Sequence, residues 1–194
     1  MWPLLLCSVT ALGIILERFI FWARLNKQKD DASLERIFSE VENGNYHDAI
    51  EIAHSSGDHV ARIFFHGLKH IKYGLSETME IRANEEIDRM KAGMLLLDTI
   101  ITISPLLGIL GTVTGIIRAF ELLGAGGMQD PKAVSIGIAE ALITTAAGLC
   151  IALPAIVFFN YFSGKVQRET GRVEKLLTRF EIITSKSVIK KDGT

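Results

Sequence analysis

Apolar residues along this chain are gathered into three long blocks, and polar and charged residues are concentrated between them. The blocks cover residues 2–22, 99–117 and 134–162. Each is close to the roughly 20 residues that an α-helix needs to cross the hydrocarbon layer of a bilayer. Core helices of soluble proteins rarely sustain uncharged runs of this length. The pattern therefore predicts an all-α membrane protein with three transmembrane helices and long helical extensions.

The alternation of apolar blocks and polar segments predicts six consecutive regions. In chain order they are a transmembrane helix at 1–24, a cytoplasmic helical segment at 25–93, a second transmembrane helix at 94–120, a periplasmic loop at 121–133, a third transmembrane helix at 134–162 and a cytoplasmic C-terminal helix at 163–194. The chain has no basic stretch before its first apolar block and no small-residue cleavage pattern after it. We therefore expect the first span to be retained.

Turn-forming residues divide the cytoplasmic segment into short helices at 42–45, 55–58 and 73–76. Asn45 and Ser76 are expected to cap the helices that follow through their side-chain oxygens. No breaker stands between Ser76 and Gly93, so a helix that runs straight into the second span is expected. The C-terminal segment is amphipathic and is expected to continue the third span. Its apolar face holds Val166, Val173, Leu176, Leu177, Phe180 and Ile183.

The distribution of Lys and Arg predicts the orientation in the membrane, since cytoplasmic loops are enriched in these residues. Basic residues follow the first span, precede the second and follow the third; they include Arg18, Arg24, Lys27, Lys29, Arg82, Arg89, Lys91, Lys165, Arg168 and Arg172. The loop between the second and third spans carries only Lys132. The N-terminus is therefore predicted to be periplasmic and the C-terminus cytoplasmic.

Composition excludes several classes of function. A net charge of −1 provides no basic surface for nucleic acid, and Cys7 and Cys150 both lie in apolar blocks, where they indicate neither a disulfide framework nor a zinc site. His59, His66 and His70 share a helical spacing, but no carboxylate or cysteine cluster accompanies them, which favours an ordinary helix face over a metal site. No nucleophile and base can be paired, so neither an enzyme nor a cofactor is predicted.

Glu140 is the one ionisable residue in the apolar run 136–159. At 100° per residue it shares a face of small and hydroxylic residues with Gly137, Thr144 and Gly148, and this face extends to Thr145. A carboxylate within a bilayer costs a few kcal/mol, so it usually faces a bundle interior or a wet cavity. The alternative is a position near the outer headgroups.

The second span carries a comparable stripe of small residues, which includes Ser104, Gly108, Gly111, Thr112, Gly115 and Ala119. Small residues four apart let helices pack closely in lipid, and this alone would account for the glycines. Thr112, Thr144 and Thr145 either line a polar path or bond carbonyls of their own helices. The residues themselves leave that choice open.

The stretches "SPLLGILGTVTGIIRAF" (104–120) and "IAEALITTAAGLCIALPAIVFFNYF" (138–162) resemble the signature of the MotA/TolQ/ExbB proton channel family. The first span, "SVTALGIILERFIFWARL", also looks like that of the family. Three spans and one cytoplasmic segment of this size resemble the ExbB/TolQ branch.

The resemblance implies a homo-oligomeric ring in the bacterial inner membrane, a pentamer in known members, whose second and third spans line the lumen. It implies an ExbD- or TolR-like partner with a single span and a TonB- or TolA-like protein that acts on the outer membrane. By position Glu140 matches the lumen glutamate of the family, and Thr112 and Thr145 match its pore threonines, with Thr144 beside them. Pro105 and Pro154 match motif prolines that shape the helices locally.

Two other functions compete with a proton channel. A non-conducting scaffold could organise envelope proteins without moving protons, and its function would survive collapse of the proton gradient by an uncoupler. A transporter of small solutes is disfavoured, because the chain shows no inverted repeat that could form a substrate site.

Overall fold

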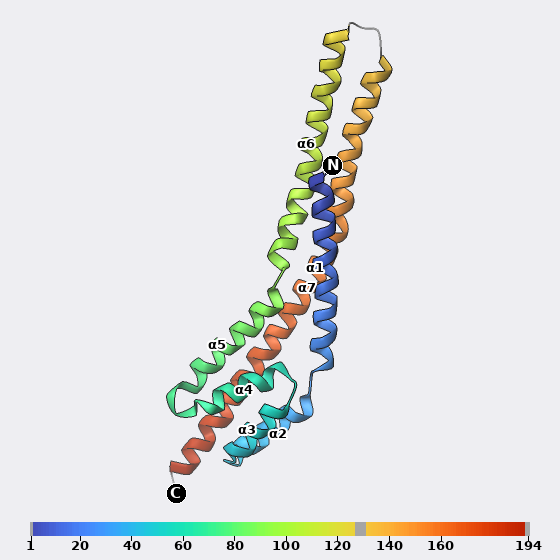
Figure 1. Cartoon of the computed structure of the whole chain (residues 1–194). Helices are drawn as coiled ribbons and strands as arrows, with labels where there is room; N and C mark the ends of the chain where they lie inside the picture. Colours follow the sequence, from blue (N-terminus) through green and yellow to red (C-terminus); the bar gives the residue numbers. More distant parts are fainter. Residues whose placement is uncertain (1, 127–130, 193–194) are drawn as a thin grey trace. The chain divides into compact units, whose positions relative to one another are not determined.

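All regular structure that is described in this protein is α-helical (Figure 1). The computed structural model describes residues 2–126 and 131–192, with the side chains at 72–73, 122–126, 131–133 and 187–192 left out. Within these residues the helices are α1 (Trp2–Lys27), α2 (Asp31–Glu42), α3 (Tyr46–Ser55), α4 (His59–Lys69), α5 (Ile71–Lys91), α6 (Met94–Gly126) and α7 (Pro131–Asp192).

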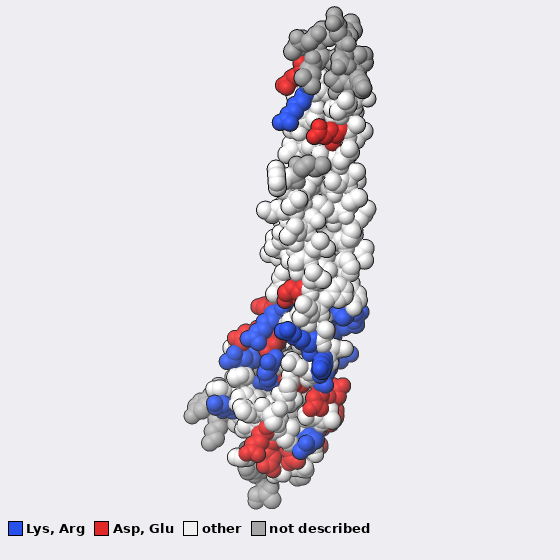
Figure 2. All heavy atoms as spheres, turned by 45° about the vertical axis from the view of Figure 1, so that its right-hand side comes forward, with Lys and Arg blue, Asp and Glu red and all other residues white. Residues whose placement is uncertain are grey.

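Three helical stretches are long and apolar enough to cross a membrane, namely Trp2–Lys27, Gly74–Glu121 and Val134–Lys186. Only 17–22% of their most apolar windows is buried within the chain, so most of this apolar surface faces outwards. Figure 2 shows a long stretch of surface without charge, while Lys, Arg, Asp and Glu gather densely outside it. Lipid or other membrane helices must cover such a surface. The predicted all-α membrane fold is confirmed.

The chain divides into two compact units. The first contains the residues up to Arg18 together with Gly93–Ser163, and the second contains Phe19–Ala92 together with the residues from Gly164 onwards. In the first unit α6 and the beginning of α7 pack against each other through small residues, as the next section describes. On α1 the buried apolar positions of this unit are Leu4, Ala11 and Ile15. Their spacing of seven and four residues places them on one face of the helix.

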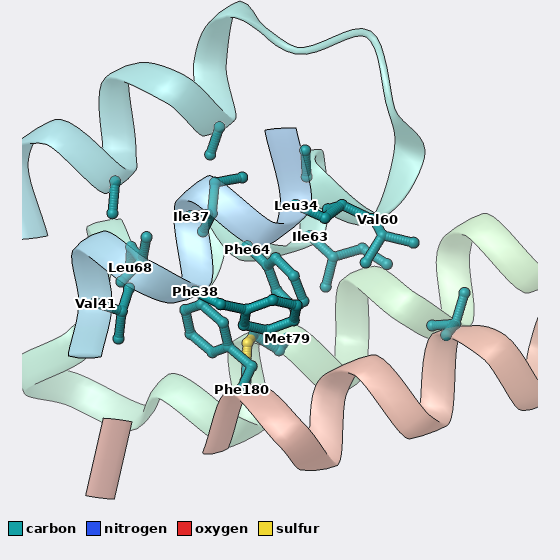
Figure 3. Packing of buried hydrophobic residues seen from close by; sticks show 14 of the residues in the cluster. Leu34, Ile37, Phe38, Val41, Val60, Ile63, Phe64, Leu68, Met79 and Phe180 are labelled. Carbon is teal, nitrogen blue, oxygen red and sulfur yellow. The ribbon is translucent and has the colours of Figure 1, made fainter. Parts of the chain in front are cut away.

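The second unit has a hydrophobic core built from five helices. Apolar side chains of α2, α3, α4 and α5 meet the amphipathic face of α7, where Val173 and Phe180 are buried as their spacing predicted. Figure 3 shows the centre of this core, where the rings of Phe64 and Phe180 stack at 4.3 Å between centroids and Phe38 packs edge-on to Phe64. Aromatic pairs of this geometry add to the stabilisation from burial.

Side-chain caps start two of the short helices, but not those expected. The breaks after Glu42 and Ser55 are confirmed, and the third expected break, at 73–76, corresponds to a kink within α5 at Gly74, which has φ of +128°. Asp30 caps α2 by accepting from the backbone N–H of Ser33 at 3.0 Å, and Asp58 caps α4 by accepting from Val60 at 2.7 Å.

The two predicted caps are wrong. Asn45 occupies the N-cap position of α3, but its side chain caps nothing and its amide donates to Glu40 Oε2 at 2.9 Å. Ser76 lies inside α5, and its hydroxyl donates to Glu181 Oε1. In both cases the side chain donates to a carboxylate instead of accepting from backbone N–H groups at the start of a helix, as a cap would.

The continuous helix expected from Ser76 into the second span is also wrong. Helix α5 ends at Lys91, Ala92 is extended with ψ of 138°, and Gly93 has φ of +74° before α6 begins. A positive φ is favourable for glycine because it has no Cβ, so Gly93 ends the helix as a C-terminal glycine does. Helix α7, which contains the third predicted span, shows no such break between Pro131 and Asp192.

Candidate functional site

The contact between α6 and α7 is made by the small residues that the sequence singled out. A Cβ added to Gly148 would lie 2.5 Å from the carbonyl oxygen of Ser104, and one added to Gly108 would lie 2.9 Å from Cα of Thr145. Such distances are far below van der Waals contact, so only glycine permits this approach. Gly111, Gly115 and Gly137 are similarly close to Thr144, Ala141 and Ala119.

Two threonines tie α7 to the backbone of α6. The hydroxyls of Thr144 and Thr145 lie 3.3 and 3.0 Å from the carbonyl oxygen of Gly108 and donate to it. Thr144 Oγ1 also lies 2.7 Å from the carbonyl oxygen of Ala141 on its own helix. Thr112, by contrast, donates to Ile109 on its own helix at 2.6 Å. The close approach permitted by the glycines is thus what brings a hydroxyl to a backbone acceptor of the neighbouring helix.

Pro105 and Pro154 lie inside α6 and α7, and both helices continue through them. Proline has no backbone N–H, so each leaves the carbonyl four residues earlier without its usual helical partner. Ser104, next to Pro105, is buried and donates to the carbonyl of Ile100 at 2.7 Å. Pro105 lies within the stretch of α6 that contacts α7, between Ser104 and Ala119, whereas Pro154 follows the glycine contacts of α7, which end at Gly148.

Glu140 lines a hollow between α6 and α7 of about 310 Å³. The hollow is walled mainly by small residues; its lining consists of Gly111, Thr114, Gly115, Arg118, Ala119, Gly137, Glu140, Ala141 and Thr144. The Glu140 side chain is exposed and forms no ion pair with any residue that the structure describes. No salt bridge among the described residues therefore holds this carboxylate in place.

The structure brings only part of the predicted polar path together. Thr144 shares the hollow with Glu140, whereas Thr112 and Thr145 do not line it. Arg118 and Thr114 were not selected as site residues from the sequence, although they share the wall. Their spacing contained the signal, because Arg118 stands seven residues after Gly111 and three after Gly115, on the same face of α6.

A second cluster of ionisable residues lies in the other unit and was not predicted. His59 is fully buried in the first turn of α4, with Nδ1 3.6 Å from Asp58 Oδ1 and Nε2 3.3 Å from Glu169 Oε1. Glu169 also pairs with Lys29 and with Arg172. Burial alone would raise the pKa of Glu169, but the contacts with His59, Lys29 and Arg172 outweigh it and lower that pKa far below its usual range.

This cluster connects three segments of the second unit and leaves the three histidines in different surroundings. Arg172 reaches Asp58 at 3.7 Å, so α7 is joined electrostatically to the N-terminus of α4. His59 belongs to the cluster, while His66 is half-buried and the ring of the exposed His70 contacts the carbonyl of His66. The sequence spacing of the histidines could not reveal this, since Glu169 is more than 100 residues away along the chain.

Comparison with known proteins gives a consistent set of relatives. The sequence profile of the MotA/TolQ/ExbB proton channel family matches residues 55–175. A biopolymer transport protein named ExbB-like 1 from Synechocystis is 42% identical over 168 residues, which cover 82% of this chain and 65% of that protein. ExbB-like 3 from the same organism is 32% identical, covering 92% of this chain and 90% of that protein.

A third relative is the Tol-Pal system protein TolQ of Pseudomonas aeruginosa. It is 34% identical over 119 residues, which cover 61% of this chain and 52% of that protein. This chain therefore spans just under two thirds of ExbB-like 1 and about half of this TolQ. The profile match contains the α6–α7 contact and Glu140.

Proposed function

The chain belongs to the MotA/TolQ/ExbB proton channel family, in its ExbB/TolQ branch, and on that premise we propose that it is the proton-channel subunit of an energy-transducing complex in the bacterial inner membrane. The observation that supports this most directly is the hollow of Glu140. It combines a carboxylate that has no salt-bridge partner among the described residues with a wall of small residues inside a long apolar stretch.

A charged side chain in lipid is energetically unfavourable, so its position indicates a function. A carboxylate at membrane depth costs a few kcal/mol, which is tolerable where it faces a polar cavity and can be neutralised by a proton. One charge that moves through 100 mV releases about 2.3 kcal/mol, so a few such transfers can drive a conformational change. Glu140 would be the group that accepts and releases the proton, with Thr144 and Thr145 holding α7 against α6.

The proposal extends to the orientation of the chain in the membrane, its oligomeric state and its partner proteins. The three spans cross the membrane with the N-terminus periplasmic and the C-terminus cytoplasmic, as the distribution of Lys and Arg favours. Copies of the chain form a ring, a pentamer as in the family, with α6 and α7 towards its lumen. Inside the ring an ExbD- or TolR-like single-span protein meets Glu140, and the complex drives a TonB- or TolA-like protein.

The decisive experiment measures proton flux into vesicles that contain the complex purified from native membranes in mild detergent. Glu140→Gln removes the titratable group while keeping the shape of the side chain, so we expect flux to be abolished and assembly to be unchanged. Glu121→Gln is the matched control, because Glu121 is an exposed carboxylate of α6 outside the hollow, and flux should persist. Normal flux in Glu140→Gln would contradict the role of Glu140, and an absence of flux through the wild-type complex would favour the non-conducting scaffold.

A further inference from the structure

The second unit has a groove between α5 and α7 that combines an apolar floor with an acidic rim. Its floor includes Ala83, Val173 and Leu177, its rim carries Glu80, Glu174 and Glu181, and its volume is about 270 Å³. No Lys or Arg lines it. Ser76 donates to Glu181, but Glu80 and Glu174 form no ion pair with any other described residue. The groove thus presents negative charge that no described ion pair compensates, above an apolar floor that is largely buried.

A different face of α7 carries the opposite charge. Arg168 and Lys175 are exposed, lie two helical turns apart and form no ion pair within the described part of the chain. They flank a shallow depression that is lined only by residues of α7, and a Cβ on Gly171 in its middle would meet nothing within 4 Å. Arg172, which also lines the depression, pairs with Asp31 and Asp58, so Arg168 and Lys175 are its unpaired cations within the described residues.

The geometry of α7 relates the two faces to each other. Glu174 and Lys175 are consecutive residues, so they stand within about 1.5 Å of the same level and diverge by roughly 100° around the helix. Copies of a membrane protein related by an axis normal to the membrane place the same residue at the same level. Glu174 of one copy and Lys175 of its neighbour therefore lie at nearly the same height along the membrane normal, as a direct ion pair requires.

We propose that the acidic groove between α5 and α7 receives the cationic face of α7 from a second copy of this chain, with Glu174 facing Lys175 of the neighbour. Two different faces of one molecule then meet, which is a heterologous contact, and repetition of such a contact around an axis closes a ring. The proposal rests on the ring in the proposed function and identifies the surfaces that form it. Opposite charge on the two faces selects this pairing over a contact between two identical faces.

Charge reversal tests the contact in the full-length protein, purified in mild detergent and sized by light scattering. Glu174→Lys and Lys175→Glu each place like charges opposite one another at every contact, and we expect each to weaken assembly at least about tenfold. The double variant E174K/K175E restores opposite charges and should assemble as the wild type does. Both residues are exposed, so folding should be unaffected. Equal assembly of all four proteins would overturn the contact.

Cross-linking gives an independent measurement. In a chain with Cys7 and Cys150 replaced by Ala, Glu174→Cys combined with Lys175→Cys should form disulfide-linked oligomers under mild oxidation. Either substitution alone should yield no linked dimer, because position 174 faces 175 and not itself. Linked dimers from the single variants would instead indicate a contact between identical faces and overturn the proposal.

The outcomes separate this inference from the proposed function. A loss of assembly in Glu174→Lys without any effect of Lys175→Glu would mean that the groove meets a basic residue other than Lys175 and would overturn the proposed pairing. Proton flux that depends on Glu140 would stand in that case. Conversely, restored assembly in E174K/K175E would support the contact even if Glu140→Gln conducted protons normally.

Discussion

The two units of this protein pack helices by opposite means. In the first, α6 approaches α7 so closely that a single added Cβ on Gly148 would collide with the carbonyl of Ser104. In the second, large side chains such as Phe38, Phe64 and Phe180 fill the space between helices. One unit therefore joins backbones through glycine and threonine, and the other joins side chains through a hydrophobic core.

The difference follows from the surrounding medium. In lipid, burying a leucine against another helix gains little, because the hydrocarbon outside is equally apolar, so close packing and interhelical hydrogen bonds stabilise the contact. In water, removing apolar area from solvent stabilises a helix contact by about 25 cal/mol per Å². The large apolar residues of the first unit, such as Leu106 and Leu153, accordingly remain on its surface.

The largest effect is expected from truncating the aromatic core of the second unit. Phe180 is fully buried and stacks on Phe64, so Phe180→Ala should lower the free energy of unfolding by about 4 kcal/mol. Ile182→Ala is the control two residues away, since half of that side chain is exposed, and its cost should be below about 1 kcal/mol. Denaturant unfolding followed by near-UV circular dichroism measures both; similar losses would contradict a well-packed core.

The ionic cluster should give the next largest effect, and one that depends on pH. Glu169→Gln removes the buried carboxylate that pairs with both Lys29 and Arg172 and should cost about 3 kcal/mol at pH 7. Because folding lowers the pKa of Glu169, its contribution is complete above the ordinary value of 4.5 and decreases as the pH falls towards the folded-state pKa. The difference between wild type and variant should therefore shrink between pH 7 and pH 3.

That prediction has a simple control on the same unit. Glu51 is an exposed carboxylate, and Glu51→Gln should change stability little at either pH. A constant difference between wild type and Glu169→Gln across the pH range would show that Glu169 does not contribute through its charge.

A smaller effect, a loss of about 2 kcal/mol in the free energy of unfolding, is expected from a substitution at the close contact between α6 and α7. Gly148→Ala places a Cβ against the backbone of Ser104, and the helices must separate to accommodate it. Gly13→Ala is the same substitution on α1, where a Cβ would meet nothing within 4 Å, and it should be neutral or stabilising. Thermal unfolding in detergent compares them. Equal melting temperatures would mean that α6 and α7 are not in close contact.

The smallest effect should come from the surface of the second unit. Arg179 forms a bidentate pair with Glu35 and lies 4.2 Å above the ring of Phe38, but both charged groups are largely in water. Glu35→Gln should therefore shift the melting temperature by no more than about 1 °C. A shift as large as that of Glu169→Gln would remove the distinction between exposed and buried pairs.

Much of the fold could be predicted because apolar runs and helical periodicity are local properties of the chain. Helix α7 buries Val173 and Phe180 as their spacing indicated, and the breaks near Asn45 and Gly57 follow from turn residues. The four-residue spacing of small residues predicted a close contact with another helix, although it did not identify that helix. The caps failed because Asn45 and Ser76 found carboxylates that local pattern does not place beside them.

The candidate site likewise contains one residue that the sequence identified and neighbours that only the structure identified. The isolated carboxylate of Glu140 in an apolar run is evident from the sequence, since the free energy of a charge in lipid depends on its position along one helix. Which side chains share its hollow depends on the facing helix. Only the packing of α6 on α7 decided that Thr144 and Arg118 line it while Thr112 and Thr145 do not.

The sequence by itself thus determined the three apolar spans, the amphipathic tail and the conspicuous Glu140, because each is a property of a single helix. Tertiary structure alone decided the partners: His59 with Glu169, the interhelical bonds to the Gly108 carbonyl and the acidic groove between α5 and α7. These join residues that are distant along the chain, and their energies depend on short distances that only the packing of helices creates.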